Sequence, residues 1–266
     1  RGGAPVIAQP MQVRVVLRDR SLLDVIDLAL RFVAEHWSFY ARAMLVVIFP
    51  AYALTLWIGM TDGWAMAWLV SLMLAAFAQA PFTILASKLV FEHGASVRAA
   101  LGASLRLLPR LAVARFTQAV ALIVSSVMCL VPVFYTGPAV LFLPEVALLE
   151  GIGIGTALTR AQRLAFANAG DAMLVWITLA CVSLVSVFLF GDTISRLILE
   201  NLFEVTAPES VFSAGGSYTA LLGFWLAIPI LATMRFFFYL NTRTQIEGWD
   251  IQARFLALTL RAREAA

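Results

Sequence analysis

The sequence predicts an all-α integral membrane protein with six transmembrane helices arranged as three hairpins, each preceded by a cytoplasmic interfacial amphipathic helix. Three observations predict it: the composition, six long apolar runs and a short internal repeat. The 266 residues are 62% hydrophobic and 13% charged, whereas soluble domains are about 45–50% apolar and about 25% charged. Too few polar side chains remain to cover a water-soluble globule, so we expect lipid to cover this one.

Six runs approach the length of about 20 apolar residues that a helix needs to cross the bilayer core. The predicted spans are Tyr40–Met60, Trp64–Phe91, Leu111–Phe134, Thr136–Glu150, Ala172–Phe190 and Tyr218–Tyr239. Prolines lie within or near five of them, which membrane helices tolerate because neighbouring groups satisfy the freed carbonyls. Kinks are the simpler interpretation of these prolines, and hinges for transport are the alternative.

The arginine distribution predicts the orientation of the chain. Placing both termini and the loops 92–110 and 151–171 on one side collects there every basic residue except Arg196. Cytoplasmic loops carry an excess of arginine and lysine, so both termini are expected in the cytoplasm. Lys88 is the single lysine, a bias typical of GC-rich bacterial genomes, and the predicted location is the bacterial cytoplasmic (inner) membrane.

Amphipathic segments precede the odd-numbered spans. Ser21 is followed three residues later by Asp24, a capping-box-like start for a helix near 21–37. Similar interfacial helices are expected near 95–108 and 155–167. These two are repeats of each other, since Ala-Leu-x4-Arg-Leu occurs at 100–107 and at 157–164. Glu-Gly punctuates the ends of the fourth and sixth spans, which supports a unit repeated three times.

The domain boundaries follow from these segments. The expected order is an N-terminal cytoplasmic arm at 1–20, a six-span membrane domain at 21–240 and a cytoplasmic tail at 241–266. An outer insertion at 191–217 interrupts the last hairpin, and Asp192 is expected to cap a short amphipathic helix there.

Three stretches resemble a bacterial family of multi-pass proteins related to the membrane domain of some glycerophosphoryl diester phosphodiesterases. They are residues 22–37, the segment 143–151 leading into 157–164, and the aromatic end 238–250 with its Arg-x3-Glu-Gly-Trp-Asp tail. The resemblance covers most of the chain, with Asn241 standing where an acidic residue is expected. No polar stretch here is long enough for the catalytic barrel. The resemblance therefore implies a membrane module that anchors or partners other proteins, without the hydrolase activity.

Charges within the apolar runs mark the candidate site, because a charge at a membrane helix centre costs roughly 2.5–3.5 kcal/mol on insertion scales. Glu145, Lys88 and Arg235 lie at comparable depth in the fourth, second and sixth spans. An ion pair between the spans is one interpretation. The two alternatives are a proton- or ion-coupling role for the Glu145 carboxylate and a contact with a lipid headgroup. Candidate interface or lipid contacts are Arg98, Arg106, Arg160, Arg163 and Arg243.

No pattern predicts catalysis, a cofactor or a metal. The glycines of 151–155 lack the spacing of a phosphate-binding loop, and the two histidines lie far apart in sequence. Membrane lipids and other membrane-protein subunits are the expected partners, and nucleic acid is not. We therefore expect a non-enzymatic subunit, anchor or scaffold; a transporter or lipid-handling protein using Glu145, and then an intramembrane enzyme, are the alternatives.

Overall fold

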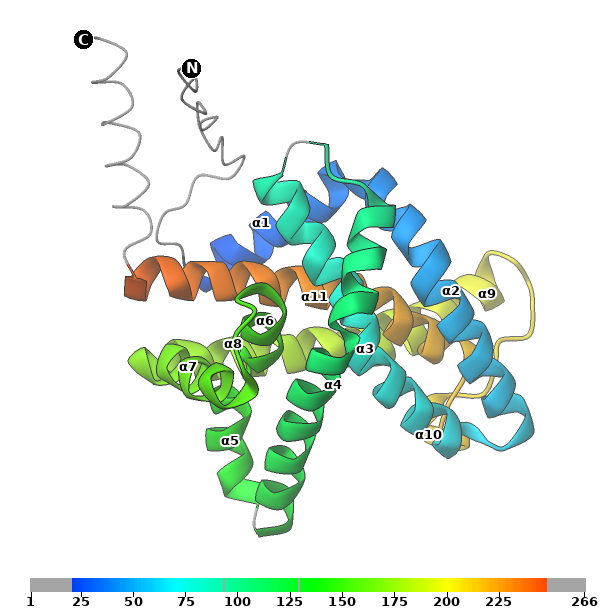
Figure 1. The fold of residues 1–266 in the computed structure, drawn as a ribbon. Coiled ribbons are helices and arrows are strands. Elements are labelled where there is room, and N and C mark those ends of the chain that lie inside the picture. The colour runs from blue at the N-terminus through cyan, green and yellow to red at the C-terminus, as the bar shows by residue number, and fades with distance from the viewer. Residues whose placement is uncertain (1–20, 93, 129, 248–266) are drawn as a thin grey trace, which may run out of the picture.

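The computed structural model describes residues 21–92, 94–128 and 130–247, which form helices and connecting turns with no strand among them (Figure 1). The elements in chain order are α1 (Leu22–Glu35), α2 (Trp37–Thr61), α3 (Trp64–Phe91), α4 (Val97–Met128), α5 (Leu130–Ala139), α6 (Leu143–Leu149), α7 (Ile154–Ala167), α8 (Ala169–Leu184), the π-helix η1 (Val185–Ile194), α9 (Ser195–Asn201), α10 (Val211–Ala214) and α11 (Tyr218–Glu247). Six stretches of the described residues are long and apolar enough to cross a membrane. The predicted all-α membrane class is confirmed.

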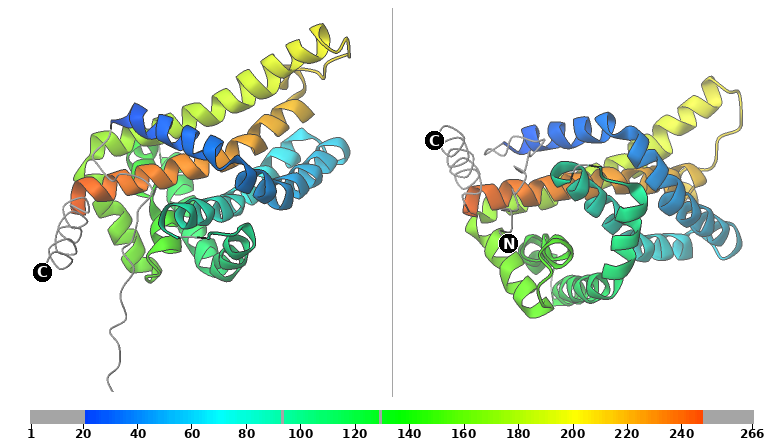
Figure 2. Two further views of the ribbon diagram at one scale, coloured as in Figure 1. Left: turned by 90° about the horizontal axis from the view of Figure 1, so that it is seen from above. Right: turned by 45° about the horizontal axis from the view of Figure 1, so that its top comes forward.

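Helix α11 is the centre of the molecule. In its most apolar stretch, 78% of the residues are buried. In the corresponding stretch of the run formed by α8, η1 and α9, only 11% are buried. Helix α11 packs against η1, α3, α1 and α2, and Figure 2 shows it running between the other helices. Buried hydrogen bonds attach α2 to it, from Trp225 Nε1 to Thr55 Oγ1 at 3.0 Å and between Tyr40 and Thr233 at 2.7 Å. The outer helices leave apolar side chains exposed, as lipid-facing helices do.

Two of the three expected interfacial helices end at a break before a span. The Ser21 side chain caps α1 by accepting from Asp24 N, and the helix ends at His36. Its apolar face, which includes Val25 and Phe32, is buried, largely against α11. Likewise α7 ends at Asn168, whose side chain caps α8. Both amphipathic helices thus belong to the packed unit.

The second repeat differs from the prediction. The expected interfacial helix at 95–108 and the third span form one helix, α4, with Pro109 inside it. The third span is also shorter than predicted: α4 is described to Met128 instead of Phe134, and α5 begins at Leu130. Pro132 lies in the first turn of α5, where its missing N–H costs no hydrogen bond. Apolar residues continue from α4 into α5, so the sequence pattern does not separate the two helices.

The fourth span is a broken helix made of α5 and α6, joined at residues 140–142. The α4–α5 hairpin projects in a different direction from the α2–α3 hairpin, so the three hairpins do not form a parallel bundle (Figures 1 and 2). Every residue of α6 from Leu143 to Leu148, including Glu145, is buried in the interior of the protein.

The outer insertion was predicted wrongly at Asp192. This residue lies inside the helical run 169–201 and begins no helix. Its buried carboxylate instead accepts hydrogen bonds from Ser210 Oγ and Val211 N, at 3.0 and 3.1 Å, and so anchors the start of α10. The helix α11 also passes the expected boundary at 240 and ends at Glu247. The N-terminal arm 1–20 and the tail beyond 247 lie outside the described residues.

Candidate functional site

Helix α6 carries the two carboxylates around which the candidate site is built. Pro144 stands at its start, where proline favours helix initiation. Glu145 follows in the first turn, where the helix dipole favours a negative charge, and Glu150 lies at the C-cap. Glu145 itself has no exposed surface.

Helix α11 presents the partners of these carboxylates along one face. Arg235, Tyr239, Arg243 and Glu247 are each four residues apart, a spacing that aligns side chains on a helix. They form two groups of contacts with α6 and its neighbours. The first, which we name the inner cluster, consists of Gln79, Arg115, Gln118, Glu145 and Arg235. The second, the end cluster, consists of Glu150, Arg160, Tyr239, Arg243 and Glu247.

The inner cluster contains a buried ion pair. Arg235 Nε lies 2.5 Å from Glu145 Oε1, and the Arg235 side chain is 10% exposed. The third residue of the predicted constellation, Lys88, is not part of it. Lys88 Nζ instead pairs with Glu92 Oε2 at 2.8 Å, one turn further along the chain, and the Glu92 side chain is half exposed. The structure therefore brings Glu145 and Arg235 together and leaves Lys88 in a local pair.

A second arginine of the inner cluster was missed from the sequence. Arg115 donates to Gln79 Oε1 and Gln118 Oε1, each at 2.8 Å, and it interacts electrostatically with Arg235 and Glu145. Arg115 is therefore hydrogen-bonded to two glutamines, and within the described part of the chain only Arg235 forms an ion pair with Glu145. Glu145 Oε2 and Arg115 Nε are buried without a hydrogen-bond partner among the described residues. The sequence signal that could have identified this site is the pair of polar residues Arg115 and Gln118, which lie three positions apart within an apolar run.

The end cluster is balanced in charge. Glu150 forms an ion pair with Arg160 Nε and accepts a hydrogen bond from the Tyr239 hydroxyl at 2.6 Å. Glu247 pairs with Arg160 Nη2 at 2.5 Å and with Arg243 Nη2 at 2.8 Å. Two arginines therefore offset two glutamates, and these contacts join α6, α7 and α11.

The charged partners of Arg160 hold it in its protonated form. Burial by itself lowers the pKa of Arg160, but the hydrogen bonds and charges of Glu150 and Glu247 more than offset burial and raise that pKa above its ordinary value. Because arginine is already charged at every physiological pH, these contacts persist across that range.

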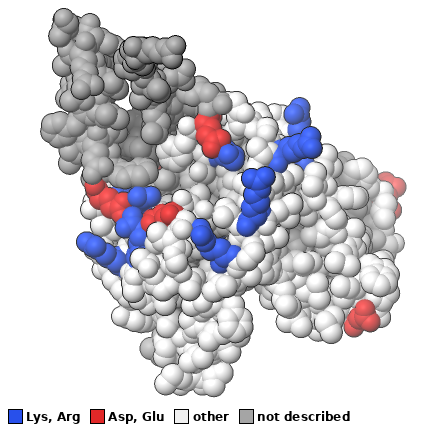
Figure 3. Space-filling model, in the orientation of Figure 1, with Lys and Arg blue, Asp and Glu red and all other residues white. Residues whose placement is uncertain are grey.

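The five arginines predicted to touch lipid or partners fall into two groups. Arg160 and Arg243 are engaged in the end cluster. Arg98, Arg106 and Arg163 are exposed on α4 and α7. In Figure 3 the basic side chains gather over one part of this face, and the surface that the α4–α5 hairpin forms below them shows no charged side chain.

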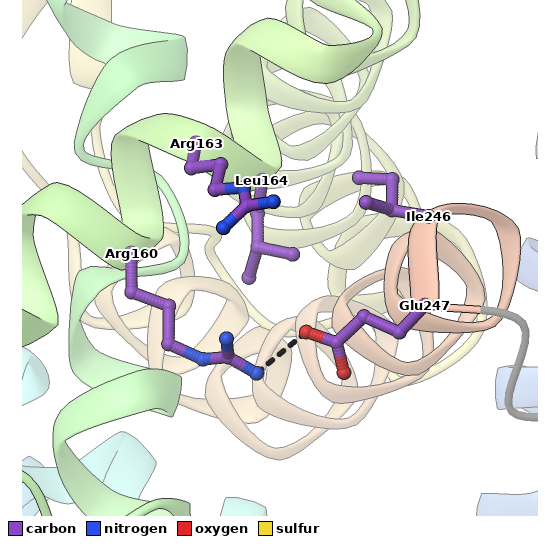
Figure 4. A pocket seen from close by; sticks show the side chains of 5 residues that line it. All are labelled: Arg160, Arg163, Leu164, Ile246 and Glu247. Carbon is purple, nitrogen blue, oxygen red and sulfur yellow. Dashed lines mark hydrogen bonds and ion pairs between the residues drawn. The ribbon is translucent and has the colours of Figure 1, made fainter.

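Two pockets accompany these clusters. One of about 230 Å³ lies between α7 and the end of α11 (Figure 4). A larger apolar groove of about 720 Å³ lies between η1 and α11, where Gly191 and Gly223 bring the two backbones into close contact. Neither pocket is lined by Glu145 or Arg235. Within the described residues no group of histidine, cysteine and acidic side chains is arranged to hold a metal ion.

Comparison with known proteins gives no relative for this chain: no family model, no curated protein and no solved structure matches it.

Proposed function

We propose that this multi-pass membrane protein is a non-enzymatic subunit, anchor or scaffold of a larger membrane assembly. One observation carries the proposal: Glu145 is fully buried and bound to Arg235, and neither pocket described above reaches it. A coupling or catalytic carboxylate must exchange protons or contact a substrate. A carboxylate that is packed away from water and tied to an arginine serves instead to fix helices relative to one another.

The end cluster supports the same proposal. Its two arginines and two glutamates form ion pairs with one another, and these pairs join α6, α7 and α11. The central helix α11 is thereby held at both its middle and its end. A rigid core surrounded by exposed apolar helices is the arrangement that a membrane anchor needs.

The proposed setting is the bacterial cytoplasmic membrane with both termini in the cytoplasm. The basic residues of the chain, Arg196 apart, support this orientation through the positive-inside rule. The resemblance of 143–151 and 238–250 to the membrane domain of some glycerophosphoryl diester phosphodiesterases supports an anchoring role in the same way.

Purification of the full chain from the membranes that naturally contain it tests this proposal. In a mild nonionic detergent, we expect a second membrane protein to remain bound in a fixed molar ratio, measured by light scattering and quantitative mass spectrometry. A harsher detergent that separates the two provides the control. A monodisperse chain without a stoichiometric partner in both detergents would contradict the subunit role.

A transporter or lipid-handling protein is the second candidate, and one observation favours it. Glu145 Oε2 and Arg115 Nε are buried without hydrogen-bond partners among the described residues. Buried polar atoms of this kind are uncommon in proteins and are found at functional sites as well as in strained packing. An ion flux that depends on Glu145 would establish this candidate.

A further inference from the structure

We propose that the pocket between α7 and the end of α11 binds the phosphate group of a phosphoester. Its lining consists of Arg160, Arg163, Leu164, Ile246 and Glu247, and it encloses about 230 Å³. In Figure 4 the Arg160 side chain extends across the gap to Glu247, and the Arg163 guanidinium lies beside the same gap. The proposal goes beyond the subunit role and does not depend on it.

The charge of the pocket favours an anion. The Glu247 carboxylate is held by Arg160 at 2.5 Å and by Arg243 at 2.8 Å, and Glu150 is held by Arg160 and Tyr239. These opposite charges cancel. Arg163 is exposed and has no hydrogen-bond or ion-pair partner among the described residues, so it is the cation that remains.

The chemistry of the free group favours phosphate. A guanidinium presents several donors in a planar fork that matches two phosphate oxygens at once. Arg163 can supply such a pair, while Arg160 stays bound to its two carboxylates. Carboxylate ligands share this geometry and carry the single charge of a phosphodiester, whereas a phosphomonoester carries more charge.

The size and walls of the pocket favour an ester over a bare ion. A water molecule occupies about 30 Å³ in the liquid, so 230 Å³ holds a phosphate group with room for several further atoms. Leu164 and Ile246 form apolar walls beside the arginines, which suit the carbon atoms of the attached alcohol.

The place of the pocket admits two sources of this ligand. It lies at the end of the 30-residue helix α11 and on the amphipathic helix α7, where the headgroup layer begins if α11 crosses the membrane. A glycerophospholipid headgroup and a soluble phosphoester such as glycerol phosphate offer the same chemistry there.

The internal repeat supplies a matched control. Arg106 occupies in the first copy of Ala-Leu-x4-Arg-Leu the position that Arg163 occupies in the second. Arg106 is likewise exposed on its helix and has no partner among the described residues, but it does not line this pocket. Removing either arginine lowers the positive charge of the chain equally, so only a specific site distinguishes them.

The test is calorimetric titration of the purified full chain in a nonionic detergent at constant ionic strength. The probes are glycerol 1-phosphate and short-chain dihexanoyl phosphatidylglycerol below its micelle concentration. We expect Arg163→Gln to weaken binding about ten-fold or more, the usual effect of losing a hydrogen bond to a charged group. Arg106→Gln should leave the affinity within about two-fold, as a distant surface charge does at this ionic strength.

The two probes separate the sources. Binding of phosphatidylglycerol alone assigns the pocket to a lipid headgroup, and binding of both with the same dependence on Arg163 assigns it to free phosphoesters as well. No binding of either probe, an Arg163→Gln protein that binds as tightly as the wild type, or equal losses in the Arg163→Gln and Arg106→Gln proteins would overturn the proposal. Circular dichroism of both variants verifies that they are folded.

Discussion

Replacement of Glu145 by glutamine tests the inner cluster most severely. Glutamine has nearly the same volume as glutamate, so the substitution removes a charge without creating a cavity. Arg235, whose side chain is 10% exposed, then loses its ion-pair partner. Arg115, which hydrogen-bonds to Gln79 and Gln118, lies in the same cluster and loses a nearby opposite charge. The Arg235 guanidinium would remain buried without its carboxylate.

The cost of this change follows from the burial of the pair. Removing one partner of a buried ion pair costs about 3–5 kcal/mol because the other charge stays desolvated. Folded domains are stable by only about 5–15 kcal/mol, so Glu145→Gln should lower the unfolding temperature of the detergent-purified protein strongly. Arg235→Gln in the same chain should recover part of the loss, since it removes one uncompensated charge.

Lys88→Gln is the matched control, and thermal unfolding followed by circular dichroism is the assay. Lys88 pairs with Glu92 across one helical turn, and the Glu92 side chain is 54% exposed. Such pairs contribute about 0.3–0.5 kcal/mol, so this variant should unfold near the wild-type temperature. The reasoning fails if Glu145→Gln is as stable as the wild type, or if Lys88→Gln destabilises the protein as much.

Three further predictions concern packing, orientation and the first helix. Gly223→Val should destabilise the protein by about 1–3 kcal/mol in chemical denaturation, since a Cβ at Gly223 would press on the backbone of η1; unchanged stability would mean that these helices are not in contact. In a cysteine-free background, Ser213→Cys should react with a membrane-impermeant thiol reagent in intact cells and Thr159→Cys only after lysis, because the proposed orientation places the first outside and the second, on α7, in the cytoplasm; the opposite result would invert the topology. Spin labels should be immobile at Val25 and mobile at Asp27, which are buried and exposed on α1, whereas equal mobility would detach α1 from the folded unit.

The sequence predicts the spans well and their ends poorly, for a physical reason. Lipid demands long apolar stretches, so composition alone reveals the six segments. The same apolarity continues from α4 into α5, so no change in the sequence pattern separates these two helices. Asp192 precedes an amphipathic segment, as an N-cap residue does, but its carboxylate binds the start of a helix that begins at Val211. That long-range contact cannot be read from local spacing.

Part of the candidate site could likewise be predicted from the sequence, and part of it could not. Glu145 and Arg235 stand out in sequence because a charge in an apolar run needs a partner. The choice of Arg235 over Lys88 depends on the break between α5 and α6, which turns Glu145 toward α11. Arg115 was missed because it lies near the expected start of a span, where an arginine looks like an ordinary flanking residue.

Ion flux through proteoliposomes tests the proposed role of Glu145 most directly. The wild-type protein and Glu145→Gln are reconstituted at equal density, a pH gradient and a membrane potential are imposed, and an enclosed pH-sensitive dye reports proton movement. A structural ion pair predicts that both proteins leave the vesicles as tight as protein-free controls. A proton flux carried by the wild type and lost in a folded Glu145→Gln protein would contradict it and establish a transporter.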